Sequence, residues 1–334
     1  MAALLYFAFK DVDFTTTFQW LLKTSIPYLL LFVFSFFISH YIRAVRWKYI
    51  ISTIKPNASV SNLLGATMIG YGVNCLVPRL GEVYRALFLG KWEGISRTSM
   101  FGTVIVERII DIIALGISVL ISVLIYNGDL YKLVPWLQSS VNIGFILMFA
   151  LVVFLILLIR LKNKLSNIIV ALIGKFSGKA AEKANTAFET LLEGFSTLRG
   201  TKNSIMTLVL TILIMLNYGL SSFIAFYMLN INDVISVSFS MAWIVMTISA
   251  FGVVIPTPGG TGSYHFINIF VLTVIYGLSE EIAAAYALLT HFITFVIFIA
   301  SPFGAVFYIN LQRKKNGLPS ENFLSVVKSD GKTL

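Results

Sequence analysis

Long apolar runs constrain this chain more than any other feature of its sequence. Five runs close to the length of a bilayer crossing span residues 26–41, 99–126, 141–159, 204–229 and 282–310. A transmembrane helix needs about 20 predominantly apolar residues, and in lipid its backbone groups must be satisfied within the helix. With 57% hydrophobic and 12% charged residues overall, the chain is predicted to be an all-α polytopic membrane protein.

Two further apolar stretches, 61–91 and 236–277, are interrupted by helix-breaking turns. The first contains Pro78 and Gly81, and the second contains the run Pro-Thr-Pro-Gly-Gly-Thr-Gly at 256–262. Proline lacks a backbone N–H and glycine relaxes the backbone, so we predict a re-entrant helical hairpin in each stretch. The order span, hairpin, span then occurs twice with opposite orientation. Such inverted-topology halves place transporter substrate sites near the membrane midplane.

Basic residues indicate the orientation of the chain, because cytoplasmic loops are enriched in Lys and Arg. Most of the 25 Lys and Arg residues fall on one side of the predicted topology, and Arg43 and Arg46 are assigned to that side. The predicted segments are an N-terminal segment 1–25, lying at the interface or belonging to a shortened first helix, a first membrane half 26–160, a cytoplasmic amphipathic connection 161–203, a second membrane half 204–310 and a cytoplasmic tail 311–334. We expect a multi-pass protein of the cell membrane with a cytoplasmic C-terminus.

The connection 161–203 carries an apolar stripe opposite a charged face. Its apolar members are Phe188, Leu191, Leu192, Phe195 and Leu198. This helical spacing predicts a helix that lies on the cytoplasmic surface of the membrane.

Charge and cysteine content exclude several function classes. The net charge of +10 follows from the cytoplasmic bias, so a nucleic-acid partner is not expected. The single cysteine, Cys75, excludes an internal disulfide and a cysteine-based metal cluster. No cofactor or metal ion is expected.

Arg79, Glu82 and Arg85 are charged residues within the first predicted hairpin. Lipid does not tolerate such groups, so they should face a protein-lined, water-accessible cavity. Their spacing lets Glu82 reach either arginine if a helix resumes at Leu80. Arginine binds phosphate through two parallel N–H donors, so we predict that Arg79 and Arg85 contact a lipid phosphate.

A second charged group, Glu107, Arg108 and Asp111, lies within the predicted span 99–126. Glu107 and Asp111 are four residues apart and share one helix face, with Arg108 beside them. Together with the hairpin charges this gives three arginines and three carboxylates, which predicts embedded charges that are neutral as a group. We interpret the second group as a structural ion-pair cluster that locks the hairpin to the span.

The turn of the second hairpin is rich in glycine, including Gly259 and Gly260. Either it is a tight re-entrant turn, or its backbone N–H groups form a nest facing a headgroup. It lacks the Lys-Ser/Thr ending of a nucleotide loop. His265 and His291 lie near it and are either packed core residues or ligand contacts. No catalytic residue is predicted, because the Gly-Ser-Tyr-His run at 262–265 lacks the second glycine of a nucleophile elbow.

Three motifs together resemble a known family. They are Asn74 followed by Pro-Arg-Leu-Gly-Glu-Val-Tyr-Arg at 78–85, Val-Glu-Arg at 106–108 with Asp111, and Pro-Gly-Gly-Thr-Gly at 258–262. In this order and spacing they resemble the transmembrane region of lysylphosphatidylglycerol synthases, also called the flippase-like family, over about residues 26–310. The chain departs from that family at His265, where the pattern has a glutamate.

The resemblance implies a membrane region that moves a lipid between leaflets. In bifunctional members a separate soluble domain attaches lysine to phosphatidylglycerol, and this chain is similar to the membrane half alone. The predicted substrate-binding residues are Asn74, Arg79, Glu82, Arg85, Gly259, Gly260 and His265, and the expected partner is a membrane lipid with a phosphate-containing headgroup. A homodimer is left open.

Two other functions remain as alternatives. One is a membrane-embedded enzyme that acts on a lipid, with Glu82, Glu107, Asp111 or His265 as acid and base groups. The other is a scaffold that does not transport and partners a separate lipid synthase.

Overall fold

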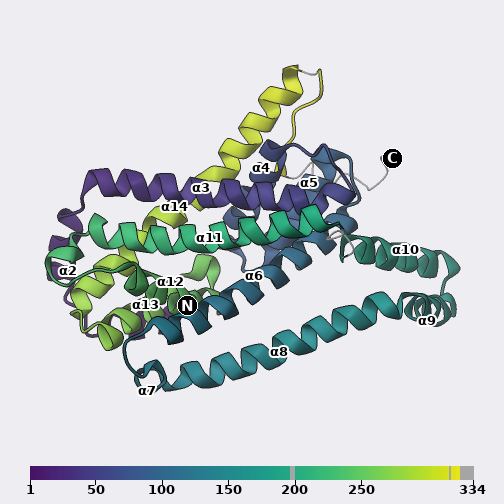
Figure 1. Cartoon of the computed structure of the whole chain (residues 1–334). Coiled ribbons are helices and arrows are strands. Elements are labelled where there is room, and N and C mark those ends of the chain that lie inside the picture. The colour runs from purple at the N-terminus through teal and green to yellow at the C-terminus, as the bar shows by residue number, and fades with distance from the viewer. Residues whose placement is uncertain (196–199, 316, 324–334) are drawn as a thin grey trace.

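The computed structural model describes residues 1–195, 200–315 and 317–323, and these residues are helical with short connections (Figure 1). In chain order the helices are α1 (Ala2–Phe9), α2 (Phe14–Leu22), α3 (Ile26–Ile50), α4 (Val60–Leu76), α5 (Leu80–Glu93), α6 (Arg97–Ile125), α7 (Leu130–Leu133), α8 (Pro135–Arg160), α9 (Lys162–Gly174), α10 (Gly178–Phe195), α11 (Thr201–Met228), α12 (Phe239–Val254), α13 (Ser263–Phe270) and α14 (Glu280–Lys315). Shorter 3-10 or π turns cover Ile51–Thr53, Ile231–Asp233, Pro258–Gly260 and Val271–Ile275. The predicted all-helical membrane fold is confirmed.

The five predicted spans all correspond to long helices. Among the described residues, α3, α6, α11 and α14 are long and apolar enough to cross a membrane. Helix α8 has 26 residues, which is about 39 Å at 1.5 Å per residue. It exposes large apolar side chains such as Ile146 and Phe149, at 67% and 72%. In a bilayer these side chains contact lipid tails.

Both predicted helix breaks are present. The first separates α4 from α5, and there Arg79 adopts a left-handed backbone with φ of 67°. The second separates α12 from α13, where Gly262 has φ of 89°. The two breaks meet, because Arg79 Nη2 donates a hydrogen bond to the carbonyl of Val254 at 3.1 Å. The re-entrant depth of the hairpins and the inverted relation of the halves stay predictions.

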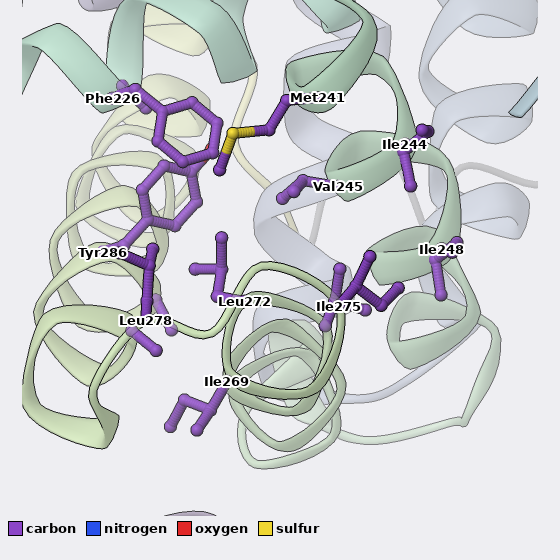
Figure 2. Close-up of a cluster of buried hydrophobic side chains, with 14 of the residues drawn as sticks. Phe226, Met241, Ile244, Val245, Ile248, Ile269, Leu272, Ile275, Leu278 and Tyr286 are labelled. Carbon is purple, nitrogen blue, oxygen red and sulfur yellow. The ribbon is translucent and has the colours of Figure 1, made fainter. Parts of the chain in front are cut away.

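Most buried apolar side chains of the described residues belong to two clusters, and both clusters include contacts between the two halves of the chain. In the second half, side chains from α11, α12, α13, the following π turn and α14 interdigitate around Phe226, Leu272 and Tyr286 (Figure 2). In the first half, α3 to α6 bury a separate cluster that includes Trp47 and Phe88. Because lipid tails are as apolar as these side chains, close packing rather than water exclusion holds each core together.

Helices α3 and α11 run side by side and join the two halves (Figure 1). Ser35 Oγ on α3 lies 2.8 Å from Ser221 Oγ on α11, and Asn217 Nδ2 donates to the Ser35 carbonyl at 2.9 Å. Small residues let helix backbones approach closely, and their polar groups bond across the contact. This pairing fixes the height of α3 against α11.

The predicted amphipathic connection forms two helices, α9 and α10. Helix α10 packs on the start of α6, where a Cβ added to Gly102 would lie 2.6 Å from the Leu191 carbonyl oxygen. Leu192, a member of the predicted apolar stripe, is buried. Part of this element therefore covers α6, while Leu198 lies outside the described residues. Its placement on the membrane surface stays a prediction.

The segments at both ends of the described chain are tied to the bundle. Helix α1 packs on α13, and α2 packs on α14. Near the other end, Glu321 forms ion pairs with Lys91 of α5 at 2.7 Å and with Arg313 of α14 at 3.1 Å. Residues 324–334 of the predicted tail lie outside the described residues.

The α4–α5 hairpin depends on a glycine at its break. Gly81 N donates to Asn74 Oδ1 at 2.7 Å, and a Cβ on Gly81 would clash with the Gly70 carbonyl and the Asn74 side chain. Gly81→Ala should therefore destabilise the protein by about 1–3 kcal/mol through overpacking. Thermal unfolding in detergent would measure this. The matched control is Gly144→Ala on α8, where an added Cβ meets no atom within 4 Å, and an unchanged melting temperature for both variants would contradict the prediction.

The predicted topology is tested by cysteine labelling after Cys75→Ala. Single cysteines placed in 127–140 and in 278–281 should react only from outside the cell, because these loops lack the basic bias. Single cysteines in 162–174 and at 317–323 should react only from the cytoplasm. Labelling of 94–96 and 278–281 from the same side would contradict the inverted hairpins.

Candidate functional site

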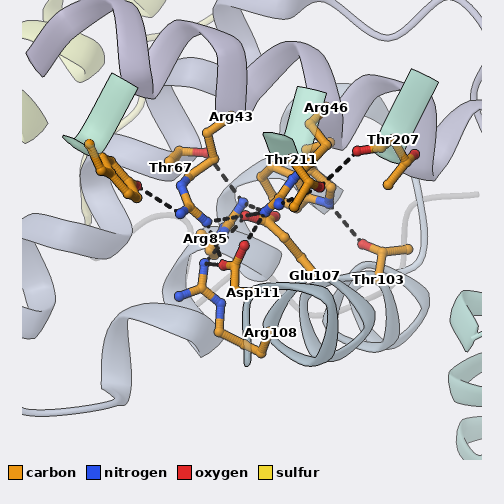
Figure 3. Close-up of polar contacts among 12 residues, drawn as sticks. Arg43, Arg46, Thr67, Arg85, Thr103, Glu107, Arg108, Asp111, Thr207 and Thr211 are labelled. Carbon is orange, nitrogen blue, oxygen red and sulfur yellow. Dashed lines mark hydrogen bonds and ion pairs between the residues drawn. The ribbon is translucent and has the colours of Figure 1, made fainter. Parts of the chain in front are cut away.

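Two carboxylates from α6 lie at the centre of a buried ion-pair cluster (Figure 3). Glu107 is fully buried, and Asp111 keeps 15% of its side-chain surface exposed. Their spacing of four residues puts both on the same helix face, as predicted. The ion pairs are Arg43 Nη1 to Glu107 Oε1 at 2.8 Å and Asp111 Oδ2 at 2.7 Å, Arg46 Nη2 to Glu107 Oε1 at 3.2 Å and Asp111 Oδ1 at 2.6 Å, Arg85 Nη2 to Glu107 Oε2 at 2.8 Å, and Arg108 Nη2 to Glu107 Oε1 at 3.3 Å and Asp111 Oδ2 at 3.1 Å.

Arg43 and Arg46 do not lie in a cytoplasmic loop, so their assignment from the sequence was wrong. Helix α3 continues to Ile50, and both arginines are buried within it, at 3% and 0% exposure. Their spacing of three residues points both guanidinium groups at the α6 carboxylates. The physical reason is ion pairing. The buried carboxylates Glu107 and Asp111 pair with Arg43 and Arg46, so the two arginines can lie inside the bundle instead of ending the helix at its surface.

The embedded charges are therefore not neutral as a group. Within the described residues, the cluster joins four arginines to the two carboxylates Glu107 and Asp111. Arginine stays protonated in proteins, so the cluster carries a formal charge of +2. Adding Arg79 and Glu82 leaves this surplus unchanged.

Neutral side chains from α3, α4 and α11 complete the cluster. Arg43 Nη2 donates to Tyr218 Oη at 2.9 Å, and Arg46 Nη1 donates to Thr211 Oγ1 at 3.1 Å, both on α11. From α5, Arg85 donates to Thr67 on α4 at 3.3 Å and lies over the ring of Trp47, 4.0 Å from its centroid. These contacts orient the guanidinium groups but add no negative charge.

An open cleft of about 360 Å³ lies beside the cluster. Its lining residues are Arg79, Glu82, Val83, Phe101, Val104, Ile105, Arg108, Asp111, Ile112 and Leu115. Two arginines and two carboxylates are charged members of this lining, and the other members are apolar. Arg108 belongs to both cluster and cleft, with 29% of its side chain exposed. The cleft therefore combines charged and apolar lining residues and, through Arg108, adjoins the positively charged cluster.

The residues predicted to bind substrate in the first hairpin fall into different places. Arg79 is exposed at the break and lines the cleft, as does Glu82. Glu82 accepts a hydrogen bond from Asn74 Nδ2 at 3.4 Å and forms no ion pair with Arg79 or Arg85 within the described chain. Arg85 is buried in the ion-pair cluster instead. Asn74 holds the first turn of α5 through Gly81 N.

The predicted residues of the second hairpin lie apart from the cleft lining. The Gly259 carbonyl accepts a hydrogen bond from His291 Nε2 at 2.9 Å. His265 is buried, its Nδ1 accepts from Gly262 N at 3.3 Å, and its ring lies 4.5 Å from that of His291. Gly260 is buried beside them with φ of 76°. A ligand role for Gly259, Gly260 and His265 stays a prediction.

Removing the central carboxylate should destabilise the fold severely. Glu107→Gln leaves four guanidinium groups facing one carboxylate, and breaking a buried ion pair costs about 3–5 kcal/mol. We expect a strongly lowered melting temperature in detergent, or loss of the monodisperse peak in size exclusion. The exposed Glu280→Gln serves as the control, because Glu280 forms no ion pair among the described residues.

A double variant separates lost pairing from lost packing. Glu107 is the carboxylate partner of Arg85, so Glu107→Gln combined with Arg85→Met should recover part of the stability. No recovery would mean that the charge surplus is not what destabilises the single variant.

Comparisons with known proteins agree on one family. The sequence model described as the lysylphosphatidylglycerol synthase TM region matches residues 1–301. The UPF0104 membrane protein MJ1595 of Methanocaldococcus jannaschii is 34% identical over 95 residues, which cover 27% of this chain and 28% of that protein. The UPF0104 membrane protein PH1989 of Pyrococcus horikoshii is 29% identical over 112 residues, which cover 32% of this chain and 33% of that protein. The chain thus spans about a third or less of these relatives, and no solved structure matches it.

Proposed function

Because the chain belongs to the lysylphosphatidylglycerol synthase TM-region family, we propose that this multi-pass membrane protein moves a lipid between leaflets. The lipid carries a phosphate-containing headgroup, which enters the cleft between α5 and α6 while its tails stay in the bilayer. The chain changes no covalent bond of the lipid in this proposal. The protein resides in the cell membrane with its C-terminus in the cytoplasm.

One observation carries the proposal: a cleft lined by charged and apolar side chains adjoins a positively charged cluster at predicted membrane depth. Its volume of about 360 Å³ falls within the roughly 300–1,000 Å³ of small-molecule sites. Charged groups inside membrane proteins mark substrate and ion pathways. In this proposal the headgroup contacts the charged lining residues, and part of an acyl chain lies against apolar ones such as Val83, Ile105 and Ile112.

Arg79 supports this proposal through its backbone as well as its charge. It is one of two described non-glycine residues with positive φ, the other being Asn230. A left-handed backbone costs an ordinary residue about 1–2 kcal/mol, and such strained positions cluster at functional sites. A glycine there would relieve the strain but would remove the guanidinium from the cleft. The cost of keeping an arginine favours a role for its side chain.

The meeting of the two helix breaks suggests how the cleft changes shape. Arg79 donates to Val254, whose carbonyl lies at the end of α12. Transporters with inverted halves alternate access by moving one repeat against the other around a fixed site. A headgroup that binds the Arg79 guanidinium would replace its hydrogen bond to Val254 and so break this contact between the two hairpins. In this proposal, ligand binding therefore weakens the contact between the hairpins that must separate for the cleft to change shape.

Substitutions of Arg79 should separate transport from folding. Arg79→Lys keeps the charge but loses the planar two-point contact with phosphate, so translocation of a labelled phospholipid in proteoliposomes should fall at least tenfold. Arg79→Gly should abolish translocation while its melting temperature stays equal or rises, because relief of about 1–2 kcal/mol of strain offsets one lost hydrogen bond of about 0.5–1.5 kcal/mol.

The control is Lys132→Gln, at an exposed lysine on α7 outside the cleft, and it should transport normally. Wild-type rates in Arg79→Lys would contradict a headgroup contact at this residue. Lipid mass spectrometry of the same vesicles tests the main alternative, because a chemically modified product would indicate an enzyme instead of a transporter.

A further inference from the structure

The positive charge surplus of the ion-pair cluster suggests that an anion binds beside it. Four arginines against Glu107 and Asp111 leave +2 in a region that lipid surrounds. An uncompensated buried charge costs several kcal/mol, so such charges are normally paired. The neighbouring side chains that touch the cluster, Tyr218, Thr211 and Thr67, are neutral. A bound anion would balance this charge.

Arg108 is the member of the cluster that can reach such an anion. Its hydrogen bonds and ion pairs within the described chain all use Nη2. The side chain is 29% exposed, whereas Arg43, Arg46 and Arg85 are almost fully buried. Since Arg108 also lines the cleft, its second terminal nitrogen, Nη1, is available to a ligand there.

Unsatisfied hydrogen-bond donors in the cluster also indicate an excess of donors over acceptors. The Nε atoms of Arg43, Arg46, Arg85 and Arg108 are buried and have no hydrogen-bond partner. The buried polar groups of native proteins are nearly all hydrogen-bonded, so four orphan donors in one cluster need a reason. Because these Nε atoms are buried, a ligand in the cleft would meet the excess of donors through the second terminal nitrogen of Arg108, Nη1, and not at Nε.

The ligand's charge follows from the balance of fixed charges. Arg79 and Glu82, which also line the cleft, cancel each other, so the site as a whole remains at +2. A phosphodiester headgroup carries one negative charge and would leave +1 uncompensated. A phosphate monoester carries about −1.5 to −2 at pH 7 and three strong acceptor oxygens.

We propose that the cleft binds a dianionic phosphate monoester group, held between the guanidinium groups of Arg108 and Arg79. The apolar wall formed by Phe101, Ile105 and Leu115 points to a lipid that ends in such a group, and this choice rests on the proposed lipid-transport function. Free phosphate shares the same chemistry. Arg108, interpreted from the sequence as a structural residue, becomes a ligand-binding one.

Binding to the purified full-length protein in detergent tests the proposal without any transport assay. Phosphatidic acid, phosphatidylglycerol and phosphatidylcholine with identical acyl chains are titrated while thermal stability and native mass spectra are recorded. Phosphatidic acid should bind at least tenfold more tightly than phosphatidylglycerol at pH 8. The preference should disappear at pH 5, because the second pKa of a phosphate monoester is about 6 and protonation leaves a single charge. Phosphatidylglycerol controls for any effect of pH on the protein itself, since the charge of this lipid does not change between pH 8 and pH 5.

Variants locate the site. Arg108→Gln should reduce the preference for phosphatidic acid to threefold or less, and Arg79→Gln, at an exposed position less important for folding, should do the same. Lys132→Gln should keep the full preference. Equal binding of phosphatidic acid and phosphatidylglycerol, or an equal loss in Lys132→Gln, would overturn the proposal.

Inorganic phosphate identifies the source of the group. Stabilisation by inorganic phosphate alone, equal to that by phosphatidic acid and lost in Arg108→Gln, would support the monoester site and overturn its assignment to a lipid. A protein that binds phosphatidic acid selectively but moves no lipid would contradict the proposed transport function and leave this binding site standing.

Discussion

The fold depends on pairing charges where water is scarce. Glu107 contacts four guanidinium groups that come from α3, α5 and α6, and two of those groups also bond to α11. Because an unpaired charge at membrane depth is so costly, each of these helices must sit at the height that brings its member to the carboxylate. The cluster therefore sets the register of the first half and joins it to α11 of the second. Apolar packing and the hydrogen bonds between α3 and α11 add to this arrangement.

The architecture was largely predictable because two strong signals act locally. Long apolar runs predict membrane-spanning helices, because a spanning helix satisfies its own backbone groups in lipid. Helices α3, α6, α8, α11 and α14 coincide with the predicted runs. Pro78 and the glycine-rich turn near Gly259 break helices through backbone geometry alone, so both breaks were also predictable. The packing of α10 on α6 was not, because an amphipathic stripe is the same whether it covers lipid or a neighbouring helix.

The candidate site was only half predictable, and Arg43 and Arg46 show why. The positive-inside bias assigns basic residues at the end of an apolar run to a cytoplasmic loop. Their spacing of three residues, with His40 three residues earlier, was a signal that the helix continues, but spacing does not reveal a partner. Glu107 lies 64 and 61 residues away in the chain, so this pairing is tertiary. Without these two arginines the embedded charges summed to zero, and the surplus that motivates a ligand could not be found.

A neutral cluster would hold the helices together at least as well, so the surplus of positive charge argues for a role beyond stability. Arg46 and Arg108 each contact both carboxylates, but Arg46 is fully buried, whereas Arg108 keeps 29% of its side chain exposed and lines the cleft. Arg108 is therefore the member of the cluster through which a ligand in the cleft can reach the surplus charge. In the proposed site a bound anion would relieve the surplus, and its departure would expose the charge to water or to another headgroup. The proposed transport requires such reversible binding, and an open cleft beside the cluster gives the ligand a way to arrive and leave.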